Sequence, residues 1–229
     1  KAGAFSLFPR GRDPVVRARS PAKRPQRLPV LVLGMALLAA DYKTAPAEAA
    51  PADVPEAIRN ALSKNGIKIL GEGGSVQCEI WMRAKLPTGP ASTEPNVALP
   101  AVPHGALLGV VRYPAEGSDR RGFQIKAGIY TLRYSLYPVN GDHQGVAPQR
   151  DFLILVRLAD DPGLDAAPNF DKLMEMARKA SGTPHPLTLS LSKDTSGASG
   201  LTNAGDDWVL HTRIGDTAVA IIVAGQYAG

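Results

Sequence analysis

Apolar residues at every second position recur along the chain, and this alternation restricts the fold more than any other feature of the sequence. Between residues 75 and 86, every second residue is apolar, namely Val76, Cys78, Ile80 and Met82. A period of two places successive side chains on opposite faces of an extended strand. Further strands are predicted at residues 106–113, 123–126, 129–137, 151–158, 187–192, 208–214 and 217–224, with a tight turn at Gly215-Asp216 between the last two.

Two short helices interrupt the strand pattern. In the first, Asp53 is the expected N-cap and Asn65-Gly66 the expected left-handed stop. The second is predicted over residues 170–181, with Asn169 as its cap and Gly182 as its stop. Strands joined by mostly short turns, with only two helices, predict an all-β protein: an antiparallel β-sandwich of about nine strands with two short peripheral helices.

The first quarter of the chain has the pattern of an export signal. Residues 1–27 are rich in Arg, Lys and Pro, and an apolar run of 13 residues follows from Leu28 to Ala40. This run is shorter than the roughly 20 residues that cross a membrane. Small residues in A-x-A order follow at residues 45–49 and predict cleavage near Ala47. A buried core helix is the alternative for this run.

The expected domains are therefore a secretory leader at residues 1–47, a linker and short helix at residues 48–66, and the β-sandwich at residues 67–229. The predicted location is the periplasm or the cell exterior, with no membrane span once the leader is removed.

Charge and cysteine content indicate which partners and which thiol chemistry to expect. The whole chain carries 26 basic and 21 acidic residues, and the predicted leader holds nine of the basic and two of the acidic ones. The remaining chain therefore has 17 basic and 19 acidic residues, which gives a net charge of about −2. A nucleic-acid partner is therefore not predicted. Cys78 is the only cysteine, so no intramolecular disulfide can form, and a buried structural thiol is expected.

Most chemical motifs are absent from the sequence, which has no phosphate-binding loop, dinucleotide-binding loop, zinc-protease motif or paired cysteines. The proline-rich residues 87–104 are predicted to form a long surface loop. The Gly- and Ser-rich residues 194–207 are predicted to be a loop as well, since their acidic residues lack the spacing of known calcium loops. His104 and His211 receive no role.

One connection is denser in polar residues and gives the candidate site. Asp142, His143, Arg150 and Asp151 lie between two predicted strands, and His185, flanked by prolines, could join them in space. His143 would act as a metal ligand or as a general base oriented by a carboxylate. The alternative is turn chemistry at residues 140–142, with Arg150 and Asp151 fixing the loop by hydrogen bonds and an ion pair.

The same region carries a resemblance. The strings IKAGIYTLRY at residues 125–134, GDH at residues 141–143 and RDF at residues 150–152, with CEIW at residues 78–81 and His185-Pro186, resemble a family of uncharacterised secreted bacterial proteins. The resemblance covers residue 67 to the C-terminus. It implies a signal peptide and a β-rich domain, and it brings no established activity. Residues 127–132 also resemble the turn-into-strand of transthyretin-like and carboxypeptidase-regulatory-like sandwiches.

Two functional hypotheses follow. The first is an exported binding or structural module that holds a protein or a small-molecule ligand, without a cofactor. The second is a small metal-assisted hydrolase or related enzyme that uses Asp142, His143, Asp151 and His185 with a divalent metal.

Overall fold

The computed structural model describes residues 41–139 and 150–225, and the chain divides after Leu38 into two units, of which the second contains all the described residues. Twelve strands and two α-helices are described there, with two short 3-10 turns. The elements are β1 (Lys43–Ala47), α1 (Glu56–Ala61), β2 (Gly66–Leu70), β3 (Val76–Met82), β4 (Leu107–Tyr113), β5 (Gly117–Ser118), β6 (Gln124–Ile125), β7 (Gly128–Leu136), β8 (Asp151–Arg157), α2 (Phe170–Ser181), β9 (Thr188–Lys193), β10 (Gly200–Ala204), β11 (Asp207–Ile214) and β12 (Thr217–Gly225).

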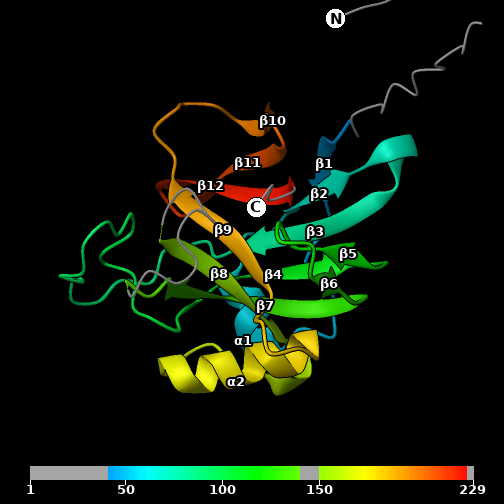
Figure 1. Cartoon of the computed structure of the whole chain (residues 1–229). Coiled ribbons are helices and arrows are strands. Elements are labelled where there is room, and N and C mark those ends of the chain that lie inside the picture. The colour runs from blue at the N-terminus through cyan, green and yellow to red at the C-terminus, as the bar shows by residue number, and fades with distance from the viewer. Residues whose placement is uncertain (1–40, 140–149, 226–229) are drawn as a thin grey trace, which may run out of the picture. The chain divides into compact units, whose positions relative to one another are not determined.

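Ten of these strands form one antiparallel sheet in the order β1-β2-β3-β4-β7-β8-β9-β12-β11-β10, and β5 pairs with β6 in a small separate hairpin. The sheet curves until its two edges approach each other (Figure 1). The rings of Tyr42, before β1, and Trp208, in β11, lie 5.5 Å apart. The predicted all-β antiparallel class is confirmed. The ten strands form one continuous curved sheet, whereas the sequence predicted a sandwich of two facing sheets.

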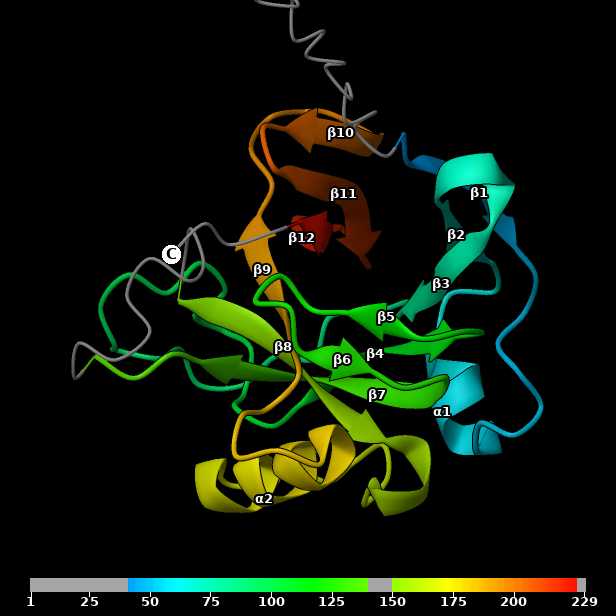
Figure 2. The same ribbon diagram turned by 45° about the vertical axis from the view of Figure 1, so that its right-hand side comes forward.

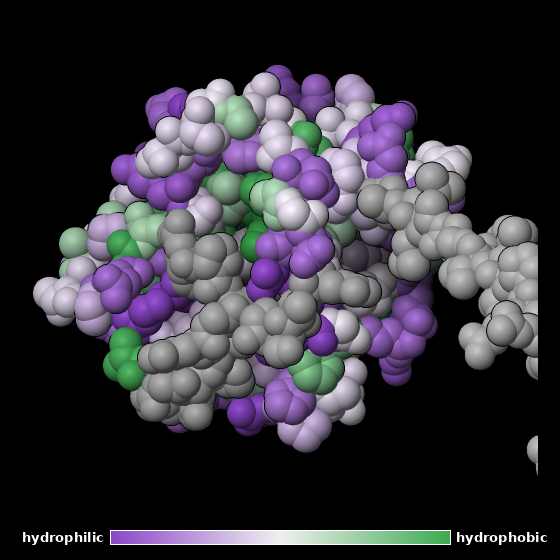
Figure 3. All heavy atoms as spheres, turned by 45° about the horizontal axis from the view of Figure 1, so that its top comes forward, coloured by the Kyte–Doolittle hydropathy of each residue, from purple (hydrophilic) through white to green (hydrophobic). Residues whose placement is uncertain are grey.

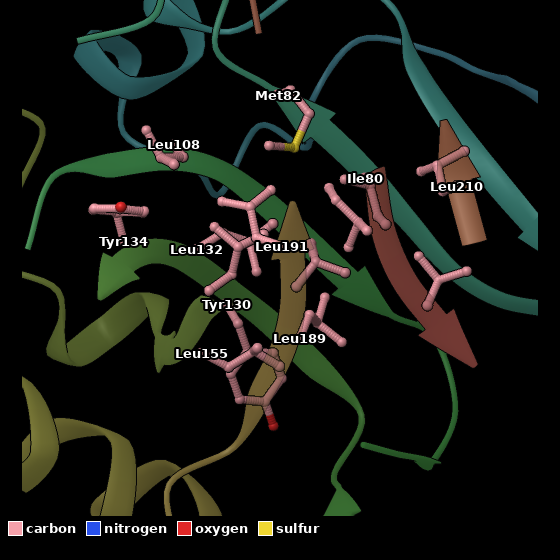
Figure 4. Packing of buried hydrophobic residues seen from close by; sticks show 14 of the residues in the cluster. Ile80, Met82, Leu108, Tyr130, Leu132, Tyr134, Leu155, Leu189, Leu191 and Leu210 are labelled. Atoms are coloured by element: carbon pink, nitrogen blue, oxygen red, sulfur yellow. The ribbon is translucent and has the colours of Figure 1, made fainter. Parts of the chain in front are cut away.

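The concave side of the sheet encloses the main hydrophobic core. Side chains from β3, β4, β7, β8, β9, β11 and β12 meet there, and Figure 4 shows ten of them by name, including Ile80, Leu132 and Leu191. Cys78 belongs to this core, as predicted, and burial raises the pKa of its thiol to about 12, with the nearby Glu79 adding to the effect. The thiol therefore stays protonated at neutral pH.

The helix α2 covers the outer face of β8 (Figure 2). Leu153 and Leu155 of β8 point into the main core, whereas Phe152, Ile154 and Val156 pack against residues of α2 in a second cluster. A strand covered on both faces needs apolar residues at successive positions, which explains the unbroken run at residues 152–156.

The helix α1 covers part of the outer face of β3 and β4. Trp81, which the alternation assigned to the opposite side from Ile80, is buried there with Ile58 of α1, and its indole Nε1 donates to the carbonyl of Glu48 at 2.7 Å. Glu79 is also buried and forms ion pairs with Lys68 and Arg112 on the neighbouring strands. The outer face of β3, where Glu79 and Trp81 lie, is therefore buried as well.

The helix boundaries predicted for α2 are confirmed. The side chain of Asn169 accepts a hydrogen bond from the backbone N–H of Lys172 at 2.9 Å, and Gly182 ends the helix in the left-handed conformation. The signals chosen for α1 are wrong: it begins after Pro55 without a side-chain cap and ends at Leu62, which is extended and forms a bridge with Arg83. Gly66 is the first residue of β2, where the Trp81 indole packs against it.

The folded unit starts earlier than the predicted domain boundary. Lys43–Ala47, assigned to the leader, form β1, which pairs with β2 along its whole length and buries Ala47. The boundary at residue 47, with a linker from residue 48, is therefore wrong for the folded unit. The strand contains Pro46, which is tolerated because β1 is an edge strand of the sheet.

A second correction concerns residues 194–207. The sequence suggested a loop throughout, but Gly200–Ala204 form β10, which pairs with β11 around a two-residue turn at Gly205-Asp206. Gly205 has a φ of +71°, which favours glycine. Within residues 41–139 and 150–225, no helix has the length and apolar character needed to span a membrane.

Candidate ligand-binding site

Arg150, a predicted site residue, fixes the proline-rich loop. Its guanidinium donates to the carbonyl of Tyr137 at 2.7 and 2.9 Å and to the carbonyl of Pro95 at 2.8 Å, and it pairs with Glu94 at 2.6 Å. These contacts join the start of β8 to the end of β7 and to residues 94–95. Arg150 also lines a pocket, so its position is compatible with both interpretations made from the sequence.

Asp151 is a buried anchor and does not face a ligand. Its carboxylate accepts hydrogen bonds from the backbone N–H groups of Ala98 at 2.8 Å and Leu99 at 3.0 Å, and from the hydroxyl of Tyr134 at 2.6 Å. The side chain is fully buried. A buried carboxylate is stable when donors surround it in this way. The loop-fixing alternative therefore holds for Asp151, which corrects its assignment as a ligand contact.

Two adjoining pockets lie at this end of β7 and β8. The first, of about 380 Å³, contains Arg150, and the second, of about 270 Å³, contains His185. Pro138 and Phe170 line both. The other lining residues are Ser92, Glu94, Val102, His104, Tyr134 and Leu136 in the first, and Arg121, Tyr137, Phe152, Met174, Arg178, Pro184 and Pro186 in the second.

Phe170 separates the two pockets and is 43% exposed, which is unusual for a side chain of this size. Its position is set by the helix start, because the Asn169 cap fixes the first turn of α2. Val139, beside Pro138, is also exposed at 64%. The two are the exposed large hydrophobic residues among those described. Exposed apolar residues grouped beside a pocket mark interaction sites.

His104 is the histidine of the first pocket, and the sequence analysis assigned it no role. Its Nε2 lies 2.9 Å from the hydroxyl of Ser135, its ring contacts Phe170 with 6.0 Å between centroids, and it bonds to the carbonyl of Pro168. Burial lowers the pKa of this imidazole below its usual value, and the bond to Pro168 opposes the shift in part. The ring is therefore neutral at neutral pH.

Gly105 holds the segment next to His104. It has a φ of +76°, its N–H donates to the carbonyl of Tyr134 at 2.8 Å, and a Cβ at this position would lie 2.3 Å from the carbonyl oxygen of Pro168. Only glycine allows this approach of two backbones. The close packing brings His104 against the segment that leads into Phe170.

A buried ion pair holds together the segment around Gly105 and the residues that lead into α2. Arg133 of β7 makes bonds of 2.7 Å from Nε and Nη2 to the two carboxylate oxygens of Asp161. The guanidinium also donates to three backbone carbonyls, those of Gly105, Gly163 and Ala166. All five contacts are to residues that flank the first pocket or lead into α2. Because its hydrogen bonds are satisfied, the pair can be buried without leaving an uncompensated charge.

His185 and two arginines border the second pocket. The ring of His185 stacks on Phe123 at 4.8 Å, and Arg121 pairs with the buried Asp119 and donates to the carbonyl of Pro186. Arg178 of α2 bonds through Nε to the carbonyl of Pro184 at 3.0 Å. Among the described residues, no partner is found for its two terminal nitrogens, which can therefore receive an anion.

Arg150 and His185 thus border neighbouring pockets, and Asp151 supports the first from inside. Asp142 and His143 lie outside the described residues, so the metal-assisted hypothesis stays a prediction. Within the described part of the chain, no group of three or more His, Cys, Asp and Glu side chains is placed to hold a metal ion. The residues that sequence reasoning missed are His104 and Phe170; their signal is weak, because it depends on contacts between distant segments.

Comparison of the chain with known protein families, with curated proteins and with solved structures found no match. The resemblance to a family of secreted bacterial proteins therefore stays a prediction.

Proposed function

We propose that this chain is an exported binding protein, and that its ligand is a small amphipathic molecule with an aromatic or other apolar body and one anionic group. The exposed Phe170 between two adjoining pockets carries the proposal. Ligand pockets are mostly apolar and contain a few polar groups that orient the ligand.

The apolar part of the ligand would lie on the pocket walls beside Phe170. Val102, Leu136 and Tyr134 line the first pocket, and the stacked rings of Tyr137 and Phe152, 4.2 Å apart, line the second. Aromatic walls favour flat apolar groups, because ring contacts add to the gain from burial. Their volumes, about 380 and 270 Å³, together lie within the range of pockets that hold small-molecule ligands.

The anionic group would bind at the rim. Glu94 already neutralises Arg150 and Asp119 neutralises Arg121, but Arg178 has two terminal nitrogens available among the described contacts. A guanidinium binds a carboxylate or sulfonate through parallel hydrogen bonds. An uncharged analogue of the same shape would lose this interaction.

The proposal is tested with two fluorescent probes of similar ring structure. One is 1-anilinonaphthalene-8-sulfonate, and the other is N-phenyl-1-naphthylamine, which lacks the sulfonate. The full chain should bind the sulfonate saturably and more tightly than the amine. Phe170→Ala should weaken both probes by about tenfold, since it removes a ring wall. Arg178→Gln should weaken only the sulfonate, by roughly fivefold.

The matched control is Lys172→Gln. Lys172 is a cation on the same helix that pairs with Glu175 and lines neither pocket. This variant should bind both probes as the unmodified chain does. Equal binding of the sulfonate by the unmodified chain, Phe170→Ala and Arg178→Gln would refute the proposed site.

The export part of the proposal rests on the basic and apolar pattern of residues 1–40. If the leader is cleaved, the pairing of β1 with β2 favours a cut before Lys43 over the predicted cut near Ala47. The full chain can be expressed in a bacterial host and its mass measured in the periplasmic fraction. A mature chain that retains Lys43–Ala47 is expected. An uncleaved product in the cytoplasmic fraction would overturn the export proposal.

A further inference from the structure

A second polar cluster lies on the outer face of the β10–β11 hairpin, away from Phe170. The imidazole of His211 in β11 is held between two side chains: its Nδ1 lies 2.9 Å from Oδ2 of Asp194, and its Nε2 lies 2.9 Å from Oγ1 of Thr202 in β10. The side chains of Asp194 and His211 are only 6% and 10% exposed. No feature of the sequence drew attention to this trio.

The strand register places Thr202 and His211 side by side. Gly200 is opposite His211 and Thr202 is opposite Val209, so Thr202 and His211 are diagonal neighbours on one face of the hairpin. Leu201 and Leu210 point to the other face and pack in the main core. Packing of these leucines fixes the face, because a shift of one residue would exchange the two sides.

Asp194 is held in place by the turn that follows β9. Its Oδ1 accepts hydrogen bonds from the backbone N–H of Ser196 at 2.8 Å and from the Ser196 hydroxyl at 2.6 Å, which leaves Oδ2 for His211. The bonds from Ser196, followed by that from His211, lower the pKa of this carboxyl to about 2. Asp194 is therefore ionised at neutral pH and accepts hydrogen bonds only.

This fixes the direction of the hydrogen bonds in the trio. Because Asp194 is an acceptor, Nδ1 of a neutral His211 carries the proton and Nε2 is left as an acceptor. The Thr202 hydroxyl must then donate to Nε2. A carboxylate, an imidazole and a hydroxyl connected in this order are the arrangement in which a histidine removes the proton of a nucleophilic hydroxyl.

A pocket of about 330 Å³ lies against the imidazole. It is lined by His211, Thr212 and Arg213 of β11, by Ala218 of β12, and by Asp194 and residues of the turn after β9. Thr202 is not a lining residue itself and adjoins the pocket through its 2.9 Å contact with Nε2 of His211. The volume is sufficient for a short acyl ester. In Figure 3, which brings the β10–β12 end forward, the described surface is largely hydrophilic, with hydrophobic residues showing in small patches. A small, water-miscible substrate suits such a surface better than a lipid does.

We propose that Thr202, His211 and Asp194 form a hydrolytic site for short-chain carboxylic esters. Thr202 is the nucleophile, His211 the general base, and Asp194 a positioning residue that acts through His211. His211 Nε2 takes the Thr202 proton as Oγ1 bonds to the acyl carbon. The ester C–O bond then breaks, and the imidazolium gives its proton to the leaving alcohol. Water, activated by the same imidazole, cleaves the acyl-threonine to the carboxylic acid and regenerates the hydroxyl.

The test uses 4-nitrophenyl acetate with the full chain. The unmodified chain should release nitrophenol at least about a hundredfold faster than a preparation of Thr202→Val, whose side chain keeps its shape but lacks the hydroxyl. Mass spectrometry of rapidly quenched peptides should find one acetyl group on Thr202. Thr202→Ser, which restores a hydroxyl, should regain turnover, and His211→Gln should lose it.

Asp194→Asn and a control variant separate positioning from structure. Asp194→Asn should lower kcat with little change in KM, because it disturbs the imidazole and leaves the pocket in place. Ser118→Ala removes an exposed hydroxyl from β5 that does not line this pocket, and it should keep full activity. Equal turnover by the unmodified chain and Thr202→Val, or an acetyl group found only on lysines, would overturn the proposal.

Discussion

At the scale of single residues, the fully buried charged groups around the first pocket serve as anchors. Asp151 and the Arg133–Asp161 pair hold loops by saturating their hydrogen bonds inside the protein. Groups that line the pockets include His104 and Phe170, which the sequence analysis did not select. The difference follows from burial, because a fully buried charge requires protein partners, whereas a group at a pocket wall keeps one side for a ligand.

His104 should make stability depend on pH. Its pKa is lowered in the folded chain, mainly by burial, so on acidification the unfolded chain takes up a proton at a higher pH than the folded one. The free energy of unfolding should therefore fall as the pH drops below about 6.5, the usual histidine value. Urea unfolding of the unmodified chain and of His104→Gln, from about pH 8 to about pH 5, measures this effect.

The expected result is a difference between the two chains that changes with pH. The unmodified chain should lose more stability than His104→Gln on acidification, because glutamine takes up no proton. Parallel curves over the whole range would show that the His104 environment does not exclude the charged form.

At the scale of elements, burial on one or both faces decides whether a strand shows a simple alternation of apolar and polar residues. β8 and β3 are covered by a helix on their outer faces, so their apolar residues extend beyond simple alternation. The strand β11 is less completely covered, and the sequence located both β11 and β12 to within one residue at each end. The helix α2 was predictable to the residue because its cap and its stop are both local signals.

The edge strand β1 should contribute measurably to stability. A chain that begins at Glu48 loses the β1–β2 ladder and the buried Ala47, whereas a chain that begins at Lys43 keeps both. The shorter chain should melt at least about 5 °C below a chain that begins at Asp41, since a loss of ~2 kcal/mol lowers the Tm of a domain of this size by several degrees. Thermal unfolding followed by circular dichroism measures this.

The chain that begins at Lys43 is the matched control and should melt close to the Asp41 chain. It lacks only Asp41, whose ion pair with Lys43 is exposed, and Tyr42, whose ring is partly buried against the main core. The fall in Tm relative to the Asp41 chain should therefore be smaller than the fall caused by losing the whole β1–β2 ladder. Equal melting of all three chains would mean that β1 is not part of the stable fold.

At the scale of the whole molecule, the curvature of the sheet determines where chemistry can occur. The helix α1 packs on the outside at β3–β4 and α2 packs on the outside at β8 (Figure 2). The pockets around Phe170 lie where the first turn of α2 meets residues at the end of β7 and the start of β8. The Asp194–His211–Thr202 trio lies on a different part of the outer surface, on the β10–β11 hairpin. Ligand binding and ester hydrolysis are therefore two separate proposals, and variants at one site leave the other unchanged.

The sequence by itself determined the elements whose signals are local. These are the alternating strands, the capped helix α2, the tight turn at Gly215-Asp216 and the buried Cys78. Only the tertiary structure decided the strand order, the single curved sheet, the inclusion of β1, and the contacts that bring His104 to Phe170 and His211 to Asp194. Periodicity and capping depend on neighbours within a few residues. The contacts of His211 with Asp194 and of His104 with Phe170 join residues 17 and 66 positions apart in the sequence, and they form only when the core packs.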